Sequence, residues 1–287
     1  MGRPVSGQTG TPPWPEFGLD ARWLTAALDW QSRAVVVRHL RVHLHNWHTA
    51  FLPPVFEPVA MLLAFGLGLG GYVANLEWHG RPVDYLTFVA PGLLAYSAFM
   101  TAVFQALFAA FIRMRYQRTW EGQLTTQVEL RHVVWGEVLW AALLATIYVL
   151  IVGLVLACFA IVGLLDLDLA SLPVALPIAF LAGCGFAAFG LCFTALMPTI
   201  DHMNLPVFLV VIPMGLLSGT YFPITHPGLT SLSEANPLYH LAQTYRGLLL
   251  GGPVARHLAT LALLSFLMVV VLVPLDLRLL RRRVLGD

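Results

Sequence analysis

Residues 133–165 read VVWGEVLWAALLATIYVLIVGLVLACFAIVGLL, and Glu137 is the only acidic or basic side chain among them. A helix needs about 20 predominantly apolar residues to cross the ~30 Å hydrocarbon layer of a bilayer. Because a helix satisfies its own backbone polar groups, it is stable in lipid. Five other stretches have the same apolar character: 52–73, 85–112, 172–197, 205–222 and 258–277. The sequence therefore predicts an all-α membrane protein with six transmembrane helices.

Composition and arginine placement agree with this fold. Of the 287 residues, 58% are hydrophobic and 11% are charged, whereas roughly 25% are charged in soluble domains. Basic residues near the ends of spans stay in the cytoplasm, so both termini of this multi-pass chain are predicted to be cytoplasmic. Thirteen of the sixteen arginines support this orientation: Arg3, Arg22, Arg33, Arg38, Arg41, Arg113, Arg115, Arg118, Arg131, Arg278, Arg281, Arg282 and Arg283.

Several kinds of chemistry are excluded by what the sequence lacks. There is no lysine, and a phosphate-binding loop of the Walker type requires one. The three cysteines lie inside predicted spans without metal-ligand spacing, and no nucleophile, base and orienting group converge as an enzyme requires. We therefore predict no catalytic residue, metal site or cofactor in this chain, so any ATP and Mg²⁺ would be bound by a partner.

The predicted organisation has four parts. Residues 1–24 are expected to form a disordered cytoplasmic tail, because they are rich in Pro and Gly and lack an apolar core. Residues 25–50 are expected to form an amphipathic helix in the inner interface. Its apolar face contains Val37, Leu40, Leu44 and Trp47. The neighbouring basic face contains Arg38, Arg41, His45 and His48. Residues 51–280 form the six-span domain, and 281–287 form a second cytoplasmic tail.

Three acidic residues lie inside predicted spans. Glu57 is about one and a half turns into the first span, and Glu137 is in the first turns of the third. We predict that both lie near the inner interface, with Arg113 or Arg131 beside Glu137. Asp276 is predicted to pair with Arg278 or Arg281. Thr126 and Glu129 have capping-box spacing, which predicts that the third span begins there.

The region 218–252 is too polar for a span and too apolar for a simple loop. Asn236-Pro237 reads as a helix N-cap followed by proline at the first helical position, and the helix is expected to end at Gly251. Some 14 residues would extend about 21 Å, too short to cross a bilayer. We predict a re-entrant helical hairpin on the outer side, between the fifth and sixth helices. Non-helical backbone at membrane depth is tolerated only against protein or a water-lined cavity. This favours a gate as the role of the hairpin.

The order of these parts resembles a known family, the permease subunit of ABC exporters of the type-2 class. The similarity is greatest to the nodulation-protein-J branch of that family, whose members export lipo-oligosaccharides, and it covers about residues 34–280. It is carried by five segments: LPPVFEP at 52–58 with GLGLG at 66–70, TWE at 119–121, GEVLW at 136–140, SGTYFP at 218–223 and NPLYH at 236–240. One departure is that Thr126 is followed by Gln127, where the family usually has Thr-Pro.

The resemblance implies a function and its residues. Residues 118–125 would be a coupling helix seated on a cytoplasmic ABC ATPase, two copies of this chain would join two ATPases, and spans one, two and five would line the path. The coupling residues would be Arg118, Thr119, Trp120, Glu121, Gly122, Gln123 and Leu124. We predict ATP-driven export of an amphipathic substrate (a glycolipid, lipo-oligosaccharide or hydrophobic drug) across the bacterial inner membrane, with lipid but no nucleic acid as a further partner.

The predicted export function also suggests residues for the substrate path and the outer gate. Aromatic walls with few charges suit a lipid-bearing cargo, and the candidates are Tyr96, Phe99, Phe208, Tyr221 and Phe222. The outer gate would include Ser218, Gly219, Pro223, Asn236, Pro237 and Tyr239. Two alternatives belong to other classes. A secondary transporter would show inverted repeats, and we find none. An intramembrane serine protease would need Ser218 beside His202 or His226, but Ser218 and His202 are predicted near opposite faces of the membrane.

Overall fold

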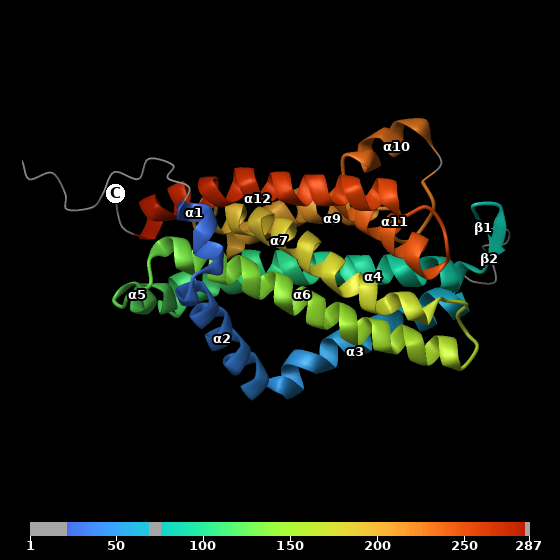
Figure 1. Cartoon of the computed structure of the whole chain (residues 1–287), viewed down its shortest axis with the longest axis horizontal. Helices are drawn as coiled ribbons and strands as arrows, with labels where there is room; N and C mark the ends of the chain where they lie inside the picture. Colours follow the sequence, from blue (N-terminus) through green and yellow to red (C-terminus); the bar gives the residue numbers. More distant parts are fainter. Residues whose placement is uncertain (1–21, 69–75, 225, 285–287) are drawn as a thin grey trace, which may run out of the picture.

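The computed structural model describes residues 22–68, 76–224 and 226–284. It is a bundle of long helices that run along the same axis (Figure 1). Four of them are long and apolar enough to cross a membrane: Tyr85–Tyr116, Leu130–Ile161, Leu169–Leu196 and Ala255–Val284. Two other apolar helical stretches, Pro54–Gly66 and Asp201–Leu216, are shorter. The membrane-protein class is confirmed, and the count of six spans stays a prediction.

The long helices pack as a core of four. Helix α4 (Tyr85–Phe104) continues through two π-helical segments, η2 (Gln105–Ala109) and η3 (Ile112–Tyr116). It lies against α6 (Leu130–Ile161) and α7 (Leu172–Leu196), and α12 (Ala255–Val284) lies against α7. The π-helical segment η2 changes the usual carbonyl pairing, and the Thr194 hydroxyl donates to the carbonyls of Ala106 and Leu107 at 2.7 and 2.8 Å.

The N-terminal region is divided into several helices instead of the single predicted helix 25–50. It contains α1 (Arg22–Thr25), η1 (Ala26–Leu28), α2 (Trp30–His45) and α3 (Trp47–Gly68). The chain is extended at Asp29, whose ψ is 147°. Helix α3 begins at Trp47, whereas the first span was predicted to begin at 52. Val37, Leu44 and Trp47 are exposed, and the face of α2 turned to the protein contains Ser32, Val35 and His39.

One β-hairpin interrupts the helical fold, which was predicted to be all-α. Strand β1 (Leu76–Trp78) pairs antiparallel with β2 (Arg81–Val83). The turn residues His79 and Gly80 both have positive φ, at 49° and 77°, as a type I′ turn requires. The Trp78 indole donates to the Gly251 carbonyl at 3.0 Å. The hairpin therefore connects the start of α4 to the segment that precedes α12.

The predicted fifth span, 205–222, is a sequence of short helical segments that ends earlier. These are η5 (Asp201–Met203), α8 (Asn204–Pro206), η6 (Val207–Val211) and α9 (Ile212–Leu216). After an irregular segment come α10 (Pro227–Glu234) and α11 (Pro237–Leu249). The Asn236 side chain accepts from the amide of Leu238, which confirms the predicted N-cap. The helix ends at Leu249, and Gly251 follows with φ 74°.

The two ends of the bundle differ. Short helix α5 (Thr119–Leu124) and the C-terminal turns of α12 lie at one end, which we call the α5 end (Figure 1). The β-hairpin and α10 lie toward the other, which we call the hairpin end (Figure 1). The predicted coupling and gate regions are therefore at opposite ends of the long helices.

Candidate functional site

Helix α5 is attached to the bundle by one buried tryptophan. Trp120 is 0% exposed, whereas Arg118, Glu121 and Gly122 are exposed. The predicted coupling residues therefore have two different orientations. Trp120 faces the helical bundle and cannot be the residue that protrudes toward a partner. Arg118 has a left-handed backbone with φ 50° at the N-cap of α5, which turns the chain sharply after η3.

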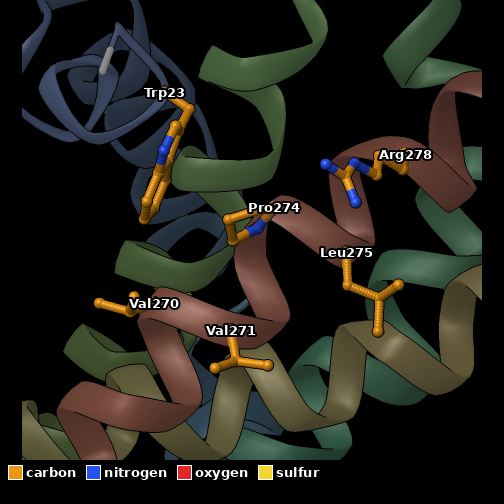
Figure 2. Close-up of a pocket in the computed structure, with 6 residues that line it drawn as sticks. All are labelled: Trp23, Val270, Val271, Pro274, Leu275 and Arg278. Carbon is orange, nitrogen blue, oxygen red and sulfur yellow. The ribbon is translucent and has the colours of Figure 1, made fainter. Parts of the chain in front are cut away.

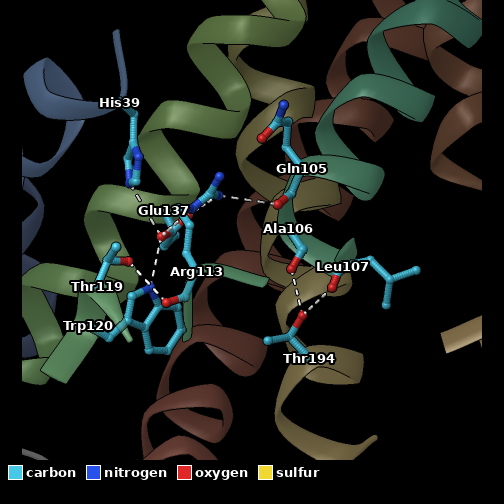
Figure 3. Close-up of polar contacts among 9 residues, drawn as sticks. All are labelled: His39, Gln105, Ala106, Leu107, Arg113, Thr119, Trp120, Glu137 and Thr194. Atoms are coloured by element: carbon cyan, nitrogen blue, oxygen red, sulfur yellow. Dashed lines mark hydrogen bonds and ion pairs between the residues drawn. The ribbon is translucent and has the colours of Figure 1, made fainter. Parts of the chain in front are cut away.

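The indole of Trp120 reaches a buried carboxylate on α6. Its Nε1 donates to Oε1 of Glu137 at 3.0 Å, and Glu137 is 1% exposed (Figure 3). Arg113, in η3 at the end of the helix Tyr85–Tyr116, donates to both carboxylate oxygens of Glu137, with Nε 3.0 Å from Oε1. Bidentate arginine–carboxylate pairs are among the strongest hydrogen-bonded contacts in proteins. The prediction that Arg113 lies beside Glu137 is confirmed.

Two further contacts bring other elements to this cluster. Nε2 of His39, on α2, lies 3.3 Å from Oε1 of Glu137. The hydroxyl of Thr119, in the first turn of α5, donates to the carbonyl of Arg113 at 3.0 Å. Four elements, α2, η3, α5 and α6, thus meet around one carboxylate. We call His39, Arg113, Trp120 and Glu137 the Glu137 cluster.

Helix α2 has additional contacts with α6. His132 contacts the Asp29 carboxylate at 3.1 Å, and its Nδ1 accepts from the Glu129 amide. The capping box at the start of α6 therefore consists of Glu129 and His132, and the predicted pairing of Thr126 with Glu129 is wrong. Burial against Trp140 and Tyr148 lowers the pKa of His43. Both ends of α2 are held against α6 by side chains.

The other two acids differ from their predicted surroundings. Glu57 is exposed and lies halfway along α3, because that helix begins at Trp47. Asp276 is 0% exposed and lies beside the Cys192 side chain. Since none of the ion pairs among the described residues includes Asp276, its predicted pairing with Arg278 or Arg281 is wrong.

The hairpin end contains a buried arginine for which the sequence predicts no role. Arg246, on α11, is 0% exposed. It donates to the carbonyls of Phe88 at 3.1 Å, Gly219 at 2.6 Å and Thr220 at 2.8 Å. Its guanidinium carbon lies 3.9 Å from the centroid of the Phe88 ring. This arginine joins α11 to α4 and to the segment that follows α9.

The predicted gate residues lie around that arginine. Ser218 and Gly219 are buried, and the Ser218 hydroxyl contacts the Gly215 carbonyl and the Thr220 hydroxyl. The Asn236 amide donates to the Met214 carbonyl at 2.7 Å. Pro237 is buried, Tyr239 is half-buried beside His257, and Pro223 is exposed. Ser218, Gly219 and Asn236 are thus brought together, whereas Pro223 points away from the protein.

Close backbone contact explains one glycine on α4. A methyl group on Gly92 would lie 2.6 Å from the carbonyl oxygen of Thr220 and 3.0 Å from Arg246. The segment after α9 therefore lies directly on α4 at this position. The Tyr85 hydroxyl donates to the Tyr221 carbonyl at 3.0 Å. Nothing in the local sequence around Gly92 distinguishes it from the other glycines of the spans.

The predicted path residues separate into three groups. Tyr96 and Tyr221 have ring centroids 5.8 Å apart, and with Glu57 they line a pocket of about 90 Å³. Phe208 and Phe222 are exposed on the surface of the chain. Phe99 is 0% exposed and packs against Phe186 with centroids 5.0 Å apart. Phe99 thus belongs to the core of the bundle.

A second hollow is larger but has little polar chemistry. About 450 Å³ in volume, it lies along α12 near Pro274 (Figure 2). Its lining is mainly apolar, and Arg278 is the one charged residue in it: Trp23, Val270, Val271, Pro274, Leu275 and Arg278. Ligand sites combine apolar walls with several convergent polar groups. The smaller pocket around Glu57 meets that description better.

Comparisons with known proteins agree with this architecture. Residues 31–250 match the family described as ABC-2 type transporter. The chain is 36% identical to Nodulation protein J of Rhizobium leguminosarum bv. trifolii over 236 residues, 80% of this chain and 84% of that protein. It is 32% identical to Nodulation protein J of Rhizobium leguminosarum bv. viciae over 275 residues, 94% of this chain and 97% of that protein.

A more distant relative is the Inner membrane transport permease YadH of Escherichia coli strain K12. It is 23% identical over 219 residues, which cover 75% of this chain and 80% of that protein. The family match covers the predicted coupling and gate regions alike. The chain therefore belongs to the ABC-2 type transporter family and is a permease of an ABC transporter.

Proposed function

We propose that this permease exports an amphipathic substrate across the bacterial inner membrane, with energy from a separate cytoplasmic ABC ATPase. The functional unit would contain two copies of the chain and two ATPases, with both termini of each permease in the cytoplasm. Relatives named Nodulation protein J support a glycolipid or lipo-oligosaccharide as the substrate. The absence of lysine agrees with the binding of ATP and Mg²⁺ in the partner.

The Glu137 cluster is the observation that carries this proposal. Helix α5 can transmit movement only if it is fixed to the long helices, and Trp120 fixes it to α6. Arg113 extends that connection to the helix Tyr85–Tyr116, which contains α4. Separating a buried ion pair leaves an uncompensated charge and costs about 3–5 kcal/mol. A force applied to α5 is therefore expected to move these helices together.

The exposed residues of α5 are the proposed contact with the ATPase. Arg118, Glu121 and Gly122 are available on the surface at the α5 end. Buried Trp120 then acts as the anchor and not as the contact. This division gives four of the predicted coupling residues one of two tasks: attachment within the permease for Trp120, and recognition of the partner for Arg118, Glu121 and Gly122.

The proposed outer gate is the segment 218–223 with α10 and α11. Arg246 and Asn236 hold it against α4 and α9. Release of the Arg246 contacts would free the segment from Gly92 and α4. The position of these contacts at the hairpin end supports a gate on the side opposite to the ATPase.

The coupling assignment can be tested with a charge reversal on the exposed face of α5. Permease and its cognate ABC ATPase are reconstituted in vesicles, and ATP hydrolysis and ATP-dependent transport of a labelled lipo-oligosaccharide are measured. Glu121→Arg is expected to reduce substrate-stimulated hydrolysis and transport at least about tenfold, the factor that 1.4 kcal/mol of lost contact energy produces.

The matched control is Gln127→Arg, which adds positive charge at an exposed position outside α5 and should retain activity. Inverted membrane vesicles report direction, because an exporter loads them with substrate when ATP is added outside. Full transport by Glu121→Arg would contradict the coupling role of α5. ATP hydrolysis by the permease alone would contradict the whole proposal.

A further inference from the structure

The pocket around Glu57 is lined by both polar and apolar side chains. It lies between α3, α4, α6 and the segment after α9, and its volume is about 90 Å³. Five hydroxyl groups and one carboxylate come from its lining residues, Glu57, Tyr96, Ser97, Thr101, Tyr148 and Tyr221. The remaining lining is apolar: Pro54, Pro58, Met61, Leu93 and Met100.

The carboxylate of Glu57 has no charged partner within the described residues. It forms none of the ion pairs found there, and it lies at the middle of an apolar helix, α3. Acidic side chains within membrane spans are costly and usually face a partner or an aqueous cavity. Glu57 is exposed and lines the pocket, so its missing counter-charge can be supplied by a ligand.

Three tyrosines line the pocket together with this carboxylate. Tyr96 and Tyr221 meet edge to face, with an interplanar angle of 61°, and Tyr148 enters from α6. Tyrosine faces attract cations through the ring quadrupole, and aromatic cages bind ammonium groups in this way. A carboxylate beside three tyrosines therefore favours a cation and disfavours an anion.

The volume limits what can enter. About 90 Å³ corresponds to roughly three water molecules in the liquid. An ammonium group with a few carbon substituents fits this space, whereas a whole oligosaccharide does not. The two methionines of the lining, Met61 and Met100, offer flexible apolar contacts to the alkyl part of such a ligand.

We propose that the Glu57 pocket binds the ammonium group of a cationic amphiphile. This proposal rests on the proposed export function and adds a positively charged group to its amphipathic substrate. Glu57 supplies the counter-charge, and Tyr96, Tyr148 and Tyr221 supply ring faces and hydroxyl oxygens. The apolar chain of the ligand extends along α3 and α4.

The test measures ligand binding to the full-length chain in lipid nanodiscs by isothermal titration calorimetry. The probes are dodecyltrimethylammonium and octaethylene glycol monododecyl ether, which share one alkyl tail and differ in charge. Empty nanodiscs correct for partitioning into lipid. The wild-type chain is expected to show saturable binding of the ammonium probe only, and Glu57→Gln should weaken it about tenfold or more.

Two variants control for charge and for ring chemistry. Glu77→Gln removes one exposed carboxylate from the β-hairpin and should leave binding unchanged. Tyr148→Phe keeps the ring face and should retain most binding, whereas Tyr148→Leu should lose it. A normal elution profile for each variant establishes that the protein is folded.

Three results would overturn the proposal. The first is equal binding of both probes by the wild-type chain, and the second is unchanged binding by Glu57→Gln. The third is dissociation of the permease dimer in Glu57→Gln, which would show that the carboxylate contacts the second copy of the chain. Binding requires neither ATP nor ATPase. Intact ammonium binding without ATP-driven transport would therefore refute only the export function, and transport without ammonium preference would refute only the pocket.

Discussion

Two buried charged side chains, Glu137 and Arg246, lie toward opposite ends of the bundle and are stabilised differently. At the α5 end, Glu137 is paired with Arg113 and His39 and receives the Trp120 indole. At the hairpin end, Arg246 donates to backbone carbonyls of Phe88, Gly219 and Thr220. The first arrangement joins side chains from four elements, and the second joins one side chain to the backbone of two segments.

This difference teaches how each end can move. Side chains of the Glu137 cluster connect rigid helices, so α5, α2 and α6 are expected to shift as one body. The Arg246 contacts hold an irregular segment that has no helical hydrogen bonds of its own to preserve its position. Loss of Arg246 should therefore loosen residues 218–222 locally, whereas loss of Glu137 should loosen several helices at once.

The largest expected effect comes from Glu137→Ala. It leaves the Arg113 side chain, which is 12% exposed, without its counter-charge, and the expected loss of stability is about 3–5 kcal/mol. Unfolding of the purified permease measures this loss. The control is Glu234→Ala, because its ion pair with Arg256 is exposed and should contribute at most about 1 kcal/mol. Equal effects of the two substitutions would show that the Glu137 cluster has no special role.

A smaller effect is expected from Arg246→Met. Three buried carbonyls lose their donor, and we expect a loss of about 3 kcal/mol. Hydrogen–deuterium exchange should increase in residues 218–222 and stay unchanged in α5. Arg246→Lys keeps the charge but not the planar donor group. Its stability should therefore lie between that of Arg246→Met and that of the wild type. Faster exchange in α5 as well would show that the two ends are coupled through the long helices.

The smallest effect tests the close contact at Gly92. Gly92→Ala places a methyl group 2.6 Å from the Thr220 carbonyl, and overpacking of this kind typically costs about 1–3 kcal/mol. Gly122→Ala is the matched control, since no atom lies within 4 Å of its added methyl group and alanine favours a helix. Stabilisation by both substitutions would refute the packing of the 218–222 segment on α4.

Local signals were the most reliable guides from sequence. The Asn236-Pro237 pair predicted a helix start, and the Asn236 side chain does cap α11. Charge placement predicted Arg113 or Arg131 beside Glu137, and in the structure the partner is Arg113. Both inferences needed only chemistry within a short segment or between two neighbouring spans. The position of Glu57 was misjudged because the start of α3 depends on its packing and not on the apolar run alone.

Other features had no local signal at all. Trp120 lies in a polar segment whose composition predicts exposure. It is buried because its indole donates to the Glu137 carboxylate, 17 positions later in the chain. Arg246 lies 158 positions from Phe88, and no pattern in α11 predicts that contact. The three π-helical segments likewise depend on how neighbouring helices meet, as Thr194 shows for η2.

By itself, the sequence determined the membrane class, the helical character and the family of this protein. Apolar length and arginine placement act locally, through transfer of side chains between water and lipid, so they are readable in one dimension. Only the tertiary structure decided that Trp120 faces inward, that Arg246 holds the 218–222 segment, and that Glu57 shares a pocket with three tyrosines. Those arrangements depend on which helices touch, and contact between distant segments is set by packing in three dimensions.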